Sequence, residues 1–466
     1  MTIERSLTAR DLDFLPAADL VREIGEAKIS PLEYIEHLFA RIERLDPRIH
    51  AFTHLLREES LHSARLAAAA LQSGRIFGPL HGIPVAIKDN IDVAGAPTTC
   101  QSRILAGRPV ASHDAEVVAR LREAGAIVIG KLALEEFAIG DQPPDSPWPA
   151  TRNPWDLDRT PGGSSCGAGA AVAAGLVPIA VGTDTGGSIR NPAAQCGVVG
   201  LKPAYGYLPL AGIFPVAKSL DHAGVVTRTV GDNMLALRVL TGQPIRPQAQ
   251  DIGGVRVGLV KHFYTSDFPS TPEVQAALEA AVETLRELGA VVVETNLAAL
   301  QVFRECGWTI LKAEAYAVHK HWLRERPEEY GAAARRLLLG GASVDANDYR
   351  EAQRMRVRLR ANLATAMEDI DILLTAVTPA PACQLNDPDA MEKSSDGSLR
   401  IPFNVTGNPA LALPIGFTAA GLPLSMQLVG RPGEESTVYR VALAYEAATG
   451  WHQRRPECAA HNEPRP

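Results

Sequence analysis

The chain has 466 residues, with 46 Lys and Arg against 53 Asp and Glu, which gives a formal net charge of −7. Apolar residues make up 46% and charged residues 21%, as in ordinary globular proteins, and 39 Gly with 34 Pro fall short of the share expected of a disordered or fibrous chain. The mild acidity and the aromatic content of 5% speak against a nucleic-acid-binding surface, where a basic stripe is expected. We therefore expect no nucleic-acid partner.

The cysteines and histidines indicate neither a disulfide framework nor a metal site. The 6 cysteines are far apart with no CxxC pair, and the 12 histidines are scattered. The N-terminus is charged where a signal peptide would be apolar. The uncharged stretch 160–183 is rich in Gly, Ala and Ser and contains two prolines, which argues against a membrane helix. We expect a cytoplasmic protein with reduced thiols, no membrane association, no metal and no cofactor.

The first predicted element is a helix with a capping box, Ser30-Pro31-Leu32-Glu33, followed by apolar residues at helical spacing until Pro47. Beyond Gly78-Pro79, short strands alternate with helices. The strands are predicted over 84–87, 126–129, 177–181, 255–260, 290–294, 370–375 and 424–429. The helices are predicted over 114–124, 167–174, 272–288, 300–321, 345–368 and 436–448. This alternation predicts the α/β class: one large domain with a mixed, largely parallel central sheet covered by helices on both faces.

The segment 160–207 is the most informative for function. Its Gly163-Ser-Ser-Cys-Gly167 has the spacing of a nucleophile elbow, but the residues before it, Asp156 to Pro161, cannot form the buried strand that the elbow requires. A dinucleotide-binding loop fails for the same reason and lacks its third glycine. No phosphate-binding loop and no HExxH motif is present.

Two glycine-serine turns and a lysine offer a different nucleophile site. Gly186-Gly187-Ser188 follows a predicted strand, and paired glycines let successive N–H groups point into one concavity that suits an oxyanion. Residues 162–165 form a second such turn, and Lys88 ends an apolar strand, where burial favours the neutral amine. Asp89 should point to the opposite face of that strand. The alternative is that these are ordinary turns and a surface cation.

Longer motifs give this site an interpretation. The sequence resembles the amidase signature family of serine hydrolases in GPLHGIPVAIKDNIDVAG (78–95), NPWDLDRTPGGSS (153–165) and GTDTGGSIRNPAAQCGVVGLKPAYG (182–206), with weaker similarity to residue 417. The resemblance implies a Ser–cis-Ser–Lys triad in which Ser188 is the nucleophile, Ser164 bridges on a cis peptide and Lys88 is the base. It also implies one amidase signature domain over 1–466, with a helical N-terminal layer (1–75), a signature core (76–240) and the rest of the sheet with the substrate-pocket helices (241–466).

The same resemblance implies the residues around the triad. The oxyanion donors would be the backbone N–H groups of Thr185, Gly186, Gly187 and Ser188, with Ser165, Asp184 and Arg190 as supporting residues. Cys166 stands where the family usually has glycine, and we interpret it as a small buried residue that starts a helix. Cys196 matches no triad position and is expected in the core.

These residues predict hydrolysis of an amide C–N bond through a Ser188 acyl-enzyme. The leading expectation is a stand-alone hydrolase of a small carboxamide, anilide or carbamate, such as an aryl acylamidase or urethanase, with only its small-molecule substrate as partner and a homodimer by family analogy. The alternative is the glutaminase (A) subunit of a tRNA-dependent amidotransferase, against which the 214–218 segment argues. A catalytically dead binding relative is a third interpretation. The acyl pocket is expected between residues 137–150, 303–322 and 379–385.

Overall fold

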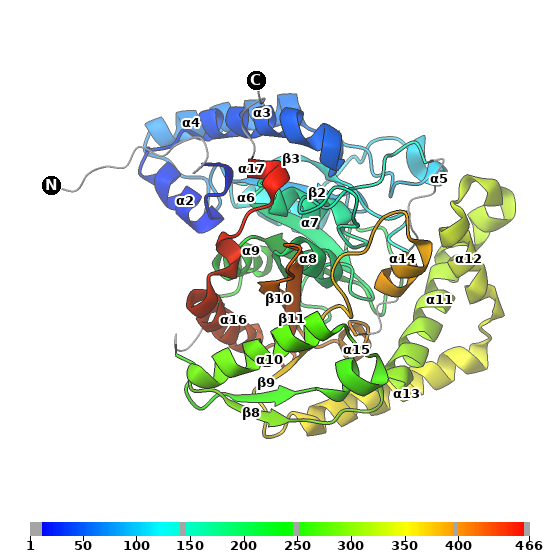
Figure 1. Cartoon of the computed structure of the whole chain (residues 1–466). Helices are drawn as coiled ribbons and strands as arrows, with labels where there is room; N and C mark the ends of the chain where they lie inside the picture. The colour runs from blue at the N-terminus through cyan, green and yellow to red at the C-terminus, as the bar shows by residue number, and fades with distance from the viewer. Residues whose placement is uncertain (1–11, 140–145, 246–250, 396–398, 461–466) are drawn as a thin grey trace.

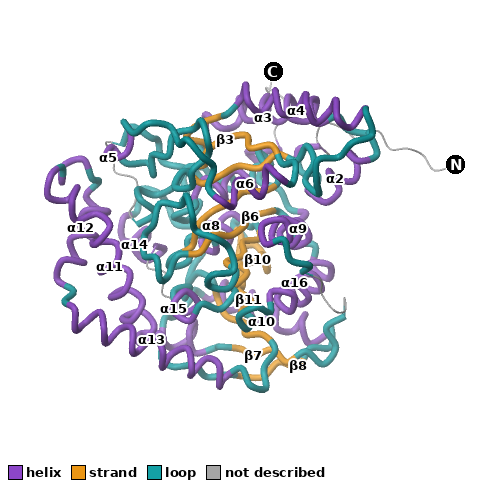
Figure 2. Tube along the Cα trace, turned by 180° about the vertical axis from the view of Figure 1, so that it is seen from behind, coloured by secondary structure: helices purple, strands orange, loops and turns teal. Residues whose placement is uncertain are grey.

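A computed structural model of the chain describes residues 12–139, 146–245, 251–395 and 399–460. Within them, one sheet of 11 strands carries helices on both faces (Figures 1 and 2). The strands are β1 Phe52–Leu55, β2 Pro84–Lys88, β3 Ile127–Leu132, β4 Ile179–Asp184, β5 Val199–Lys202, β6 His222–Thr227, β7 Arg256–Leu259, β8 Val291–Glu294, β9 Ile372–Ala376, β10 Ala410–Phe417 and β11 Pro423–Val429. The helices are α2 Ala17–Gly25, α3 Pro31–Ile49, α4 Arg57–Gln72, α5 Arg103–Ala106, α6 Glu116–Glu123, α7 Cys166–Ala173, α8 Arg190–Cys196, α9 Val230–Thr241, α10 Pro272–Glu287, α11 Leu300–Glu325, α12 Ala332–Gly340, α13 Ala346–Ala366, α14 Pro388–Ser395, α15 Pro402–Thr406, α16 Glu435–Thr449 and α17 Glu457–Ala460.

The sheet is mixed, with strand order β1-β3-β2-β4-β6-β5-β10-β11-β9-β7-β8. β2 pairs in parallel with β3 and β4, and β7 pairs in parallel with β8 and β9. The strands between these two groups pair antiparallel. The expected α/β class with one mixed sheet between helical layers is confirmed. Parallel pairing covers less of the sheet than expected, because β5, β6 and β10 were not recognised in the sequence and run antiparallel to their neighbours.

The central strands are apolar on both sides because each side faces its own hydrophobic core. In β2, Val85 and Ile87 join one core and Ala86 the other. β4 repeats this alternation, with Ile179 and Ala180 on opposite sides. A strand covered on both faces reads as a continuous apolar run, which is why these two strands were predictable. Lys88 ends the first of them inside the protein.

Helix α7 packs unusually close to its neighbours because its sequence, CGAGAAVA, carries only small side chains on its contact faces. A Cβ placed on Gly167 would clash with the Ala51 carbonyl oxygen, and one on Gly169 would lie 2.8 Å from that of Pro192. The glycines therefore let the start of α7, and the serine turn before it, sit against the sheet and α8. None of the described helices combines the length and apolar character that crossing a bilayer requires.

The first predicted helix is longer than expected. α3 continues through Pro47 to Ile49 and ends where His50 adopts a left-handed conformation, with φ 57°. Ser30 occupies the N-cap, but its side chain makes no capping hydrogen bond. The helix tolerates Pro47 because the proline lies only two residues before its end, so a single intrahelical hydrogen bond is lost. Helices α3 and α4 form a layer at the top of Figure 1.

A buried ion pair ties this layer to the signature region. Arg41 on α3 pairs with Asp13 and donates to the carbonyl oxygen of Ala174, just beyond α7, at 2.8 Å. Because Asp13 and Arg41 are both buried, Asp13→Ala leaves an uncompensated charge and should lower the free energy of unfolding by about 3–5 kcal/mol. The exposed pair Asp19–Arg22 is the control: Asp19→Ala should change it by about 1 kcal/mol or less in the same denaturant titration. Equal effects from the two variants would contradict this role.

Candidate active site

Lys88 connects the strand β2 to the first serine turn. Its Nζ donates to Ser164 Oγ and to Thr183 Oγ1, both at 2.9 Å, and the side chain is fully buried. No carboxylate within the described ranges forms an ion pair with this amine. Burial lowers the pKa of Lys88 to about 8, since a charged amine is poorly solvated there. A substantial neutral fraction is therefore available near neutral pH.

The neighbouring strand holds a second buried lysine in the opposite electrostatic situation. Lys131 of β3 lies 2.9 Å from Asp89 Oδ1 in an ion pair. Asp89 therefore points away from Lys88, as expected from the alternation of side chains along a strand. The same carboxylate accepts a hydrogen bond from the Thr99 hydroxyl. Lys131 has a counter-charge in contact and Lys88 has none, so only Lys88 suits proton abstraction.

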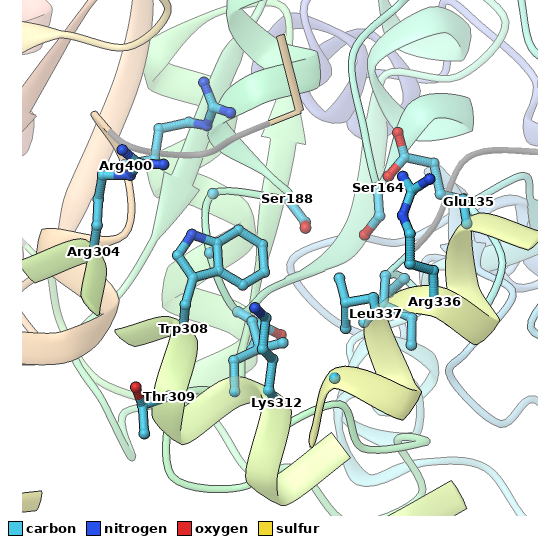
Figure 3. Close-up of a pocket in the computed structure, with 18 of the residues that line it drawn as sticks. Glu135, Ser164, Ser188, Arg304, Trp308, Thr309, Lys312, Arg336, Leu337 and Arg400 are labelled. Atoms are coloured by element: carbon cyan, nitrogen blue, oxygen red, sulfur yellow. The ribbon is translucent and has the colours of Figure 1, made fainter. Parts of the chain in front are cut away.

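The two glycine-serine turns meet at one place. The peptide bond between Gly163 and Ser164 is cis, as the resemblance implied. The Ser165 N–H donates to the Ser188 carbonyl oxygen at 3.0 Å, which holds the second turn against the first. Ser164 and Ser188 line the same cavity, and Figure 3 shows both side chains pointing into it. A substrate carbonyl bound in that cavity would therefore lie near both serine hydroxyls.

Asp184 organises the turn that carries Ser188. Its carboxylate accepts from the N–H of Gly187 at 2.9 Å and pairs with Arg190 at 3.0 Å. Burial alone would raise the pKa of Asp184, but the Arg190 guanidinium outweighs it and holds this pKa well below its usual range. The Gly187 N–H is thus engaged and cannot point at an oxyanion, so the proposed donors are Thr185, Gly186 and Ser188.

Two residues of this arrangement were missed in the sequence. Thr183 accepts from Lys88 and lies within the quoted motif, one residue before Asp184. Asn404, on α15, donates to Asp184 Oδ1 at 2.8 Å and accepts from Arg190 at 2.6 Å. It lies 220 residues beyond Asp184 in the chain. The only signal for it was the weak similarity of the FNVTGNPA segment to the family.

Glu135 also belongs to the site and was not singled out beforehand. A Cβ placed on Gly163 would collide with the Glu135 carboxylate, so this carboxylate rests directly against the serine turn. Glu135 and Ser164 line the same cavity. A side chain at position 163 would have to displace the Glu135 carboxylate from the serine turn.

The cysteines near the site are structural, as interpreted. Cys166 is the first residue of α7 and is buried, and burial raises the pKa of its thiol to about 11. Cys196 is buried at the end of α8 within the hydrophobic core. A thiol with a raised pKa is a poor nucleophile at neutral pH. Among the described residues, no cluster of three or more metal-ligating side chains occurs.

The cavity in front of Ser188 has a volume of about 780 Å³. Its walls include Ala138 and Ile139, and residues of α11 between Arg304 and Lys312, which all fall within the expected segments; Gln301 of α11 lines it too. Residues 140–145 of the expected loop lie outside the described residues. The 379–385 turn does not line the cavity; instead α12 supplies Arg336 and Leu337, and Arg400 closes another side (Figure 3).

The family comparison covers most of the chain. The model of a family described as Amidase matches residues 33–439. The A subunit of glutamyl-tRNA(Gln) amidotransferase from Moorella thermoacetica is 38% identical, with 96% of this chain and 99% of that protein aligned. Similarity at this level over both full lengths extends far beyond the serine motifs.

Solved structures share the fold. One described as an amidase superposes with a TM-score of 0.86 at 33% identity, covering 93% of this chain and 99% of that one. The A subunit of glutamyl-tRNA(Gln) amidotransferase from Thermotoga maritima gives a TM-score of 0.76 at 32% identity, covering 94% and 95%. The expectation of an amide C–N hydrolase is supported by these matches.

Two expectations are contradicted. A stand-alone hydrolase of a small carboxamide, anilide or carbamate, such as an aryl acylamidase or urethanase, is wrong, because relatives matching at full length are named as parts of an amidotransferase. The expectation of a small-molecule partner and no nucleic acid is wrong, because those names contain both a tRNA and a subunit. The 214–218 segment misled the interpretation, since a short local departure says little against identity along the whole chain.

The environment of Lys88 predicts the pH dependence of amide hydrolysis. Burial lowers the pKa of Lys88 to about 8, so if the neutral amine is the base, as we predict, kcat/KM should fall about tenfold per pH unit below that value. Above it the profile should level off, since the base is already neutral. Initial rates across a pH series would measure this. A flat profile between about pH 6 and 9 would contradict Lys88 as the base.

Proposed function

Because the chain belongs to the amidase signature family, we propose that it is the glutaminase (A) subunit of a tRNA-dependent amidotransferase. The observation that carries this proposal is the end-to-end similarity to proteins named as this component of the amidotransferase, at 38% identity over 96% of the chain. In this proposal glutamine is the amide donor, and the protein partners are the other subunits of the complex. The tRNA-bound amino acid accepts the released ammonia.

The side chains at the site suit an acyl-transfer cycle. Neutral Lys88 takes a proton from Ser164 Oγ while Ser164 takes one from Ser188 Oγ, and the Ser188 oxygen attacks the glutamine carboxamide carbon. The N–H groups of Thr185, Gly186 and Ser188 stabilise the oxyanion. The relay then returns a proton to the nitrogen, which leaves as ammonia. Water attacks the acyl-enzyme by the same relay, and glutamate is released.

The cavity also suits a donor that carries a carboxylate. Lys312 of α11 and Arg336 of α12 line it together with the two serines (Figure 3). In the part of the chain that the structure describes, neither side chain has a hydrogen-bond or ion-pair partner. The cavity is lined by four cationic side chains and by the carboxylates of Glu135, Glu305 and Glu392. Because Lys312 and Arg336 are not engaged by these carboxylates, they can bind a negatively charged group on the amide, as in glutamine.

Ser188→Ala should abolish glutamine-dependent ammonia release, because it removes the oxygen that forms the acyl-enzyme in the proposed cycle. Cys166→Ser is the matched control and should retain activity, since the thiol is buried. The assay combines the chain with cognate amidotransferase subunits and glutamyl-tRNA, and follows both ammonia and the amidated aminoacyl-tRNA. A wild-type complex that forms neither product would refute the proposed function.

Lys312→Met should raise KM for glutamine about tenfold or more with a small change in kcat, because it removes a charged contact to the bound carboxylate. Lys320→Met is the control, since Lys320 lies on the same helix but is exposed and outside the cavity. The kinetic constants would be compared for glutamine and for its α-carboxamide, which lacks the charge. An unchanged KM for glutamine would exclude Lys312 from donor binding.

A further inference from the structure

A buried carboxylate braces the oxyanion turn from behind. Asp221 accepts a hydrogen bond from Thr185 Oγ1 at 2.6 Å. It also accepts from the N–H groups of Val216 at 3.0 Å and Ala217 at 3.1 Å, which fix it within its own loop. Thr185 borders the catalytic cavity and a second cavity of about 330 Å³ that Asp221 lines. Asp221 thus holds the first residue of the turn from the side away from the substrate.

The same loop is fastened to the helix that forms the opposite wall of the active site. The N–H and hydroxyl of Ser219 donate to the Glu314 carboxylate at 3.0 and 2.6 Å. Glu314 lies on α11, two residues after Lys312 and six after Trp308, which both line the catalytic cavity. Tyr349 of α13 donates to the same carboxylate at 2.8 Å. Glu314 therefore fixes the loop relative to α11.

We propose that Glu314 and Asp221 are positioning residues that set the Thr185 end of the oxyanion turn relative to the substrate-binding face of α11. The path runs from Glu314 through Ser219 and Asp221 to Thr185. Oxyanion donors must be held within about 0.5 Å of the productive geometry. Gly186 and Gly187 have no side chains to anchor them, so the turn depends on its two ends. Asp184 anchors the Gly187 end, and Asp221 anchors the Thr185 end.

This inference differs from a purely structural role for the same groups. If Asp221 only stabilised its own loop, its bonds to Val216 and Ala217 would suffice, and the Thr185 hydroxyl would be dispensable. Thr185→Val removes the hydroxyl while preserving the shape of the side chain and both loop bonds. Thr185→Ser keeps the hydroxyl and is the conservative rescue. Tyr349→Phe removes a bond to Glu314 that lies off the path.

The test follows the rate of Ser188 labelling by a small fluorophosphonate, which needs the nucleophile and oxyanion donors but neither glutamine nor partner subunits. Thr185→Val should slow labelling about tenfold. This is less than the roughly 100-fold or greater loss of rate that follows removal of an oxyanion donor, because the Thr185 N–H itself remains. Thr185→Ser should recover most of the rate. Glu314→Gln should slow labelling about threefold, because it weakens one hydrogen bond to Ser219. Tyr349→Phe should be labelled as fast as the wild type. Thermal unfolding of each variant separates slow labelling from poor folding.

The outcomes distinguish this inference from the proposed function. Thr185→Val that labels as fast as the wild type overturns the inference, and so does an effect of Tyr349→Phe equal to that of Glu314→Gln. The double variant Thr185→Val/Glu314→Gln should be no slower than Thr185→Val alone; multiplied effects overturn the continuous path. A wild-type chain that is not labelled at Ser188 overturns the triad and this inference together. Labelling without glutamine turnover overturns only the glutaminase proposal.

Discussion

A buried lysine without a counter-charge is the constraint around which the rest of the site is arranged. Lys88 is fully buried at the end of β2, and its amine donates to the hydroxyl groups of Ser164 and Thr183. Burial lowers its pKa to about 8, whereas any carboxylate in contact would work in the opposite direction. The fold meets this condition by turning Asp89 toward Lys131 on the next strand. Lys88 and Lys131 lie on neighbouring strands, and they differ in chemistry because the Asp89 side chain points toward Lys131.

The negative charge of Asp184 favours the protonated form of Lys88, but Arg190 balances this charge. Asp184 lies on the strand beside that of Lys88. Arg190 pairs with it, and Arg190 in turn donates to Gln427 at 2.9 Å and to Asn404 at 2.6 Å. The C-terminal part of the chain therefore completes the electrostatics of a site whose proposed nucleophile, Ser188, lies in the first half. Helix α15 and strand β11 thus contribute side chains to the same site as β2 and β4.

Local patterns were predictable from the sequence, and contacts between distant segments were not. β2 and β4 were predictable because both of their faces are buried, which gives a continuous apolar run. The serine turns were predictable because paired glycines permit backbone angles that other residues resist. Asn404 and the α12 wall carry no strong local signal, since their roles exist only once the chain is folded. Net charge misjudged the partners because the charge of one chain does not describe a complex. Gly187 was expected among the oxyanion donors, but its N–H donates to Asp184. A sequence motif does not show the direction of an N–H group.

The chemistry and the substrate cavity are built from separate stretches of the chain. Lys88, Ser164 and Ser188 come from the strands and turns of the first half, whereas Lys312 and Arg336 come from α11 and α12, which stand to one side of the sheet in Figure 1. Substitutions on those helices can change which acyl group is admitted without disturbing the lysine or the cis turn. Such a division lets natural selection alter the substrate range of an enzyme while its reaction stays the same. It also accounts for solved structures that share this fold but are described as different enzymes.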